Sequence, residues 1–218
     1  MKTLNRRKFI KQSSLFTVGA GSMFTLTGAT PIHPVPAMTA KDDLNIIGPK
    51  EGFSPHIGTL VSMLNWMRYV ILILVKRMSV EDLDYIYDDD SNSIGAMLLH
   101  LAATERFYQL HTFEGRTWGD WPEEDMEKWS VASGLGDEAR KTIKGHDLDF
   151  YLDALKTVRE HSLAEFAKRD DEWLMKVDED WPWGPTNNYC KWFHVCEHES
   201  NHNGQVKWLR SRLPSSKK

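Results

Sequence analysis

Residues 193–205 read FHVCEHESNHNGQ and place His194, His198 and His202 at intervals of four. In an α-helix this spacing puts the three imidazoles on one face, each about one turn from the last. Two consecutive histidines at this spacing can bind one metal ion. All three cannot, because the outer two lie about 12 Å apart along the helix axis. A metal site on this helix therefore needs a ligand from another part of the chain.

The candidate for that ligand is His100, in the apolar segment SIGAMLLHLA of residues 93–102. A single histidine on a buried helix face is usually a core residue that bonds a polar group. His100 becomes a candidate ligand because the histidine pair on the later helix lacks a third partner. The remaining histidines, His33, His56, His146 and His161, have no partner in the sequence pattern, and His111 lies too far along the helix to share an ion with His100.

Residues 198–202 also read His-Glu-x-x-His, the signature of zinc peptidases. A third ligand usually follows further along the chain, but no Asp, Glu or His follows His202, and Trp208 occupies the position of the third histidine of the extended motif. The peptidase hypothesis is therefore disfavoured. Adjacent helical side chains point about 100° apart, so we expect Glu199 to be solvated or to lie behind the metal ligands.

Four segments have the apolar pattern of core-facing helices. They begin near Pro55, Ser91 or Ser93, Leu148, and Thr186 or Asn187, and they span about residues 55–78, 91–113, 148–168 and 187–212. A short capped turn follows the first, at residues 79–87, and no segment alternates like a strand. The sequence thus predicts an all-α four-helix bundle with a long, structured crossover between helices two and three.

Other features of the sequence have simple interpretations. The first helix is nearly apolar, but Asn65 and Arg68 lie in its middle, which favours a buried helix over a membrane span. Asp88–Asp90 is expected to be a solvated loop, and Cys190 and Cys196, six residues apart on one helix, are expected to be free thiols. Nine tryptophans predict a core or pocket rich in aromatic rings.

The charge of the chain argues against a nucleic-acid partner. Residues 1–40 hold five of the 27 basic residues and none of the 31 acidic ones, so residues 41–218 carry 22 basic and 31 acidic side chains, a net charge near −9. An acidic surface repels phosphate backbones. We expect residues 41–218 to form one helical domain.

The two histidine-bearing segments together resemble the DinB-like superfamily. Residues 193–205 are similar to its last helix, in which a His-x-x-x-His pair precedes a Gly-Gln step, and residues 93–102 are similar to its second helix, which donates a third histidine. The resemblance covers about residues 54–213. It implies that His100, His198 and His202 bind one divalent metal ion, that His194 is additional, and that the protein is a homodimer.

Three neutral imidazoles leave an open coordination position, which is typical of a catalytic site. The resemblance implies a metal-dependent enzyme that acts on a small molecule, of the hydrolase or thiol-transferase type. The alternative is a non-catalytic exported metal-binding or sensing module. Zinc is the default ion for three histidines, with nickel, iron and manganese as the other candidates.

The first forty residues are expected to be an export signal. Arg6 and Arg7 precede Lys8, Phe9 and Ile10, and the segment resembles the twin-arginine motif. A mildly apolar run at residues 13–29 and a proline-rich stretch at 31–36 follow, and small residues suit cleavage after residue 29, 37 or 40. These features predict a periplasmic protein, and export counts against a thiol transferase, because the thiol cofactors of that class are cytoplasmic.

Export should depend on the arginine pair. Replacing both residues (Arg6→Lys, Arg7→Lys) keeps the charge but should retain the precursor in the cytoplasm, which cell fractionation measures. Normal processing of the double variant would contradict the twin-arginine hypothesis.

Overall fold

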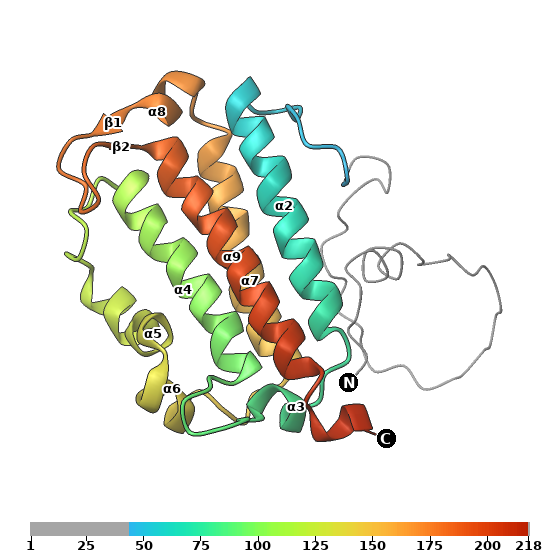
Figure 1. The fold of residues 1–218 in the computed structure, drawn as a ribbon. Helices are drawn as coiled ribbons and strands as arrows, with labels where there is room; N and C mark the ends of the chain where they lie inside the picture. The colour runs from blue at the N-terminus through green and yellow to red at the C-terminus, as the bar shows by residue number, and fades with distance from the viewer. Residues whose placement is uncertain (1–43, 218) are drawn as a thin grey trace, which may run out of the picture. The chain divides into compact units, whose positions relative to one another are not determined.

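A computed structural model describes residues 44–217, so the predicted export signal lies outside the described residues. Four long helices lie side by side in a bundle (Figure 1). Around the bundle, α2 packs on α9, α9 on α4, α4 on α7, and α7 on α2. The predicted all-α bundle is confirmed, with helices α2 (Pro55–Val75), α4 (Ile94–Thr112), α7 (Leu148–Phe166) and α9 (Asn188–Arg210).

Side-chain caps fix where these helices begin. Ser93, Asp147 and Asn187 each accept a hydrogen bond from a backbone N–H in the first turn of α4, α7 and α9. The helix α2 begins differently, because the side chain of its N-cap residue Ser54 makes no capping hydrogen bond. Ser54 instead donates to Asp171, and Asp171 accepts from the N–H groups of the first turn of α2.

The crossover between α4 and α7 contains two helices that the sequence did not predict, α5 (Glu123–Gly134) and α6 (Gly136–Thr142). Figure 1 shows them beside α4. Three acidic residues follow Pro122 in the first turn of α5, which suits a helix N-terminus. Trp129 and Ala132 are buried in the core. The strong acidic and polar character of this segment concealed its short apolar face.

The shorter elements lie at the two ends of the bundle (Figure 1). The predicted capped turn is α3 (Val80–Asp84), in which Ser79 and Asp82 form a reciprocal capping box. The connection before α9 contains α8 (Asp171–Met175) and an antiparallel pair of two-residue strands, β1 (Val177–Asp178) and β2 (Thr186–Asn187), where no strand was expected. Strands of two residues are too short to show alternation. A final 3-10 helix, η1, spans Pro214–Lys217.

Among the described residues, α2 is the helix that is long and apolar enough to cross a membrane by length and composition. In the structure its apolar side chains Ile57, Leu60 and Leu64 are fully buried in the bundle core. Asp88–Asp90 is exposed, and Cys190 and Cys196 are free thiols, all as predicted.

One charged side chain from each bundle helix meets the others in the core. Arg68 of α2 and Arg159 of α7 each bind both Glu105 of α4 and Glu199 of α9. Arg159 Nε lies 2.7 Å from Glu105 Oε1, and Arg68 Nη2 lies 2.9 Å from Glu105 Oε2. Of the two positions predicted for Glu199, the solvated one is therefore wrong, since only 2% of its surface is exposed.

Further hydrogen bonds support this buried charge quartet. Each arginine also donates to a main-chain oxygen of a neighbouring helix, and Ser162 donates to Glu105 over 2.7 Å. Burial alone would raise the pKa of Glu105, but Arg159 and Arg68 bring it below its usual value. Glu105 is therefore ionised at neutral pH and pairs with both arginines.

Breaking the quartet should destabilise the fold strongly. Arg159→Met leaves two buried carboxylates short of a partner and should lower the free energy of unfolding by about 3–5 kcal/mol, as urea titration measures. Glu160→Ala on the same helix removes an exposed pair with Lys156 and should cost less than about 1 kcal/mol. Equal effects of the two variants would contradict the role of the quartet.

Candidate metal centre

His100 of α4 and the pair His198 and His202 of α9 converge on one point. The Nε2 atom of His198 lies 2.8 Å from Nε2 of His100 and 3.2 Å from Nε2 of His202. One ring nitrogen of each residue falls within 4.8 Å of the others. Imidazole nitrogens that share an ion through bonds of about 2.0–2.1 Å lie roughly 3 Å apart. The spacing therefore suits a single ion bound by three histidines.

Outer hydrogen bonds fix the tautomers of two of these rings. His100 Nδ1 lies 2.9 Å from the carbonyl oxygen of Ala132, which can only accept, so Nδ1 carries the proton. His202 Nδ1 donates in the same way to Gln205 Oε1 over 2.8 Å. Both Nε2 lone pairs therefore face the shared point without a proton, which is the arrangement that a metal ligand needs.

Burial also keeps the three imidazoles neutral. Burial, reinforced by the neighbouring histidines, lowers the pKa of His198 to about 3 and that of His202 to about 4. Burial lowers the pKa of His100 as well. Neutral imidazoles at pH 7 are available to bind a cation without first losing a proton.

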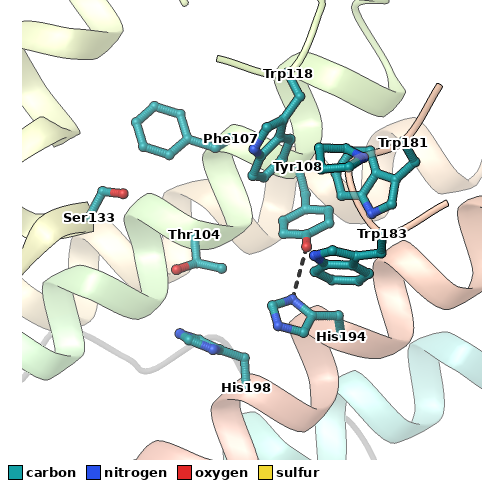
Figure 2. A pocket seen from close by; sticks show the side chains of 10 residues that line it. Thr104, Phe107, Tyr108, Trp118, Ser133, Trp181, Trp183, His194 and His198 are labelled. Carbon is teal, nitrogen blue, oxygen red and sulfur yellow. Dashed lines mark hydrogen bonds between the residues drawn. The ribbon is translucent and has the colours of Figure 1, made fainter. Parts of the chain in front are cut away.

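His194 lies next to this centre but outside it. Its ring centroid is 5.4 Å from that of His198, and its Nδ1 lies 2.9 Å from the hydroxyl of Tyr108 (Figure 2). Burial raises the pKa of Tyr108, so the hydroxyl keeps its proton at neutral pH. Where this hydroxyl donates to Nδ1, the proton of the neutral His194 ring is on Nε2.

A pocket of about 200 Å³ opens beside His194 and His198 (Figure 2). The predicted aromatic pocket is confirmed, because five of its wall residues are Phe, Tyr or Trp. Two hydroxyl side chains, from α4 and α5, complete the wall away from the indole rings. The lining residues are Thr104, Phe107, Tyr108, Trp118, Ser133, Trp181, Pro182, Trp183, His194 and His198.

A buried lysine holds the tryptophan-bearing wall in place. Lys191 is 1% exposed, and its Nζ lies 2.7 Å from Asp178 Oδ2 and 2.8 Å from His111 Nε2. The same ammonium group lies 4.5 Å from the ring centroid of Trp181. These contacts tie α4, β1 and α9 together at the pocket. The sequence pattern placed His111 away from the metal ligands, correctly, but it missed this cluster.

The sequence model of the DinB superfamily matches residues 63–206 of the chain. The chain belongs to the DinB superfamily. The crystal structure of a conserved protein from Enterococcus faecalis has the same fold, with a TM-score of 0.54 and 16% sequence identity over 70% of this chain and 93% of that chain. No curated protein sequence matches the chain.

In this DinB superfamily protein, the sequence did not reveal the hydrogen-bond partners of the clustered histidines. Gln205 was noticed as one half of a Gly-Gln step, without a role. Ala132 acts through its main-chain oxygen, which no side-chain pattern records. Tyr108 had no signal beyond its place on the helix of His100.

Of the other histidines among residues 44–217, His56 and His161 are exposed and His146 is half-buried on Phe150.

The metal-free protein should lose stability in mild acid. Histidines of the unfolded chain take up protons below pH 6.5, whereas His198 and His202 resist protonation until pH about 3 and 4. The contribution of His198 and His202 to the free energy of unfolding is thus complete above pH 6.5 and declines as the pH falls. With their partial exposure allowed for, the loss at pH 5.5 is about 1 kcal/mol per histidine.

Urea unfolding of chelated protein at pH 7.5 and 5.5 measures this loss. The double variant His198→Gln, His202→Gln is the control. Between pH 7.5 and 5.5 its free energy of unfolding should decrease by about 2 kcal/mol less than that of the wild-type protein. An identical fall in the two proteins would exclude these histidines as the cause.

Proposed function

We propose that this protein is an exported, metal-dependent enzyme of the hydrolase or thiol-transferase type that acts on a small molecule. One divalent ion would be bound by His100, His198 and His202. Zinc is the first candidate, and nickel, iron and manganese are the others. The observation that carries the proposal is the convergence of the Nε2 atoms of His100, His198 and His202 at a point where His198 also lines a pocket.

The chemistry of the donors supports an open site. Three protein nitrogens leave a coordination position for another molecule, and such an ion supplies Lewis acidity that polarises a carbonyl or activates water or a thiol. Ala132 and Gln205 hold two of the ligand rings in orientation. His194 presents an N–H beside His198, where it would bind and orient an acceptor atom of the substrate.

A non-catalytic metal-binding or sensing module is the alternative function. That function needs no space for a second molecule at the ion, whereas the pocket reaches His198 directly. The predicted periplasmic location favours the hydrolase over the thiol transferase. The resemblance to the superfamily also supports a homodimer, as an added proposal.

Metal content of the purified protein tests the site. Wild-type protein should contain about one divalent ion per chain, and His100→Ala, His198→Ala and His202→Ala should each lower the occupancy at least tenfold, because two imidazoles bind more weakly than three. His194→Ala is the matched control on the same helix and should keep most of the metal. Elemental analysis after dialysis measures all five proteins.

Two outcomes would contradict the proposal. Full occupancy in His100→Ala would exclude a site built from two helices. A bundle of this size buries enough apolar surface to fold without metal, so the helical circular dichroism signal should survive chelation. Loss of that signal would assign the ion a structural role.

A further inference from the structure

We infer that the pocket binds a small molecule with one planar, uncharged aromatic ring and an anionic head group that reaches the metal centre. This inference rests on the proposed function and names the substrate class of the same site. Figure 2 shows its two halves, with the aromatic side chains around the upper part and His194 and His198 at the lower part.

The volume limits the size of the molecule. The pocket holds about 200 Å³. An apolar cavity of about 150 Å³ accommodates benzene, whereas drug-sized ligands occupy about 300–1,000 Å³. One ring with a short head group therefore fills the pocket, and any further ring or chain would extend into solvent.

The wall favours a ring as the body of this molecule. Trp118 packs edge-on against Trp181 at a centroid distance of 4.8 Å, and Trp181 packs edge-on against Trp183 at 5.5 Å. Perpendicular indoles present both faces and edges, which are the surfaces against which another aromatic ring packs well. Trp183 is 57% exposed and lines the pocket, so it is placed to cover a bound ring.

The same wall disfavours a cationic body. Aromatic cages bind quaternary ammonium groups through the negative faces of their rings. Here Lys191 already places its ammonium group 4.5 Å from the centroid of Trp181, and none of the acidic side chains of residues 44–217 lines the pocket. Glu197, the sequence neighbour of His198, is exposed and accepts a hydrogen bond from Asn201 instead.

The lower half favours an anionic head group. When Tyr108 donates to Nδ1 of His194, the Nε2–H of His194 is left to donate to another molecule. The ring of His194 lies beside that of His198, with 5.4 Å between the two centroids. A carboxylate, thiolate or hydroxamate would accept that hydrogen bond and bind the ion at the same time.

Two hydroxamates that share a head group test the inference. Benzohydroxamate and acetohydroxamate differ only in the ring, and calorimetric titration of the zinc-loaded full chain measures both affinities. Benzohydroxamate should bind at least about tenfold more tightly, as expected for a ring packed among aromatic side chains. The chelated protein should bind neither.

Two tryptophan variants locate the effect. Trp183→Ala should reduce the advantage of benzohydroxamate to about threefold or less, because it removes one aromatic wall. Trp208→Ala is the matched control, since this exposed indole contacts Tyr87 and Arg212 and not the pocket. It should leave both affinities and their ratio unchanged.

The outcomes separate this inference from the proposed function. Equal affinity for the two hydroxamates, or an undiminished ratio in Trp183→Ala, would overturn the aromatic substrate class while the metal site stands. Tight binding of tetramethylammonium would also overturn it, in favour of a cation cage. Failure of the zinc-loaded protein to bind either hydroxamate would overturn the open site itself.

Discussion

Four buried charges, one from each long helix, set the geometry on which the rest of this protein depends. Arg68, Glu105, Arg159 and Glu199 bind one another in the core and are almost fully removed from water. An apolar interface tolerates small rotations and shifts of a helix, because one methyl group packs much like another. A closed ring of ion pairs does not, because any displaced helix would leave a buried charge without a partner.

This constraint acts directly on the metal centre. Glu199 follows His198 in the sequence, and Glu105 lies on the same helix as His100. Fixing the two carboxylates on the two arginines therefore fixes the rotation of α9 against α4, and with it the direction of the histidines. The motif His-Glu-x-x-His thus has a different use here from the one in zinc peptidases, since its glutamate belongs to the core and its two histidines meet His100.

The sequence predicted the parts of this arrangement that have a period. Histidines four residues apart, apolar stripes on long helices and the apolar setting of His100 all follow from helical geometry, and the structure brings those side chains together. The sequence did not predict contacts that depend on main-chain atoms, or contacts between segments that lie far apart in the chain. The carbonyl of Ala132, the contact of Lys191 with His111, and the helices α5 and α6 are of that kind. The sequence left Glu199 either solvated or behind the histidines, because its arginine partners come from other helices and are not visible in its own segment.

The hydrogen bond from His100 to Ala132 makes the crossover part of the metal centre. The next residue, Ser133, lines the pocket, so two consecutive residues of α5 contact the histidine cluster and the pocket respectively. A molecule that moves α5 as it enters would also move the acceptor that orients the ring of His100. If the three histidines bind an ion, occupancy of the pocket and affinity for the ion are linked quantities, and each changes the other by the same factor. The helix α5 is accordingly a place where changes in sequence would tune both without altering any ligand.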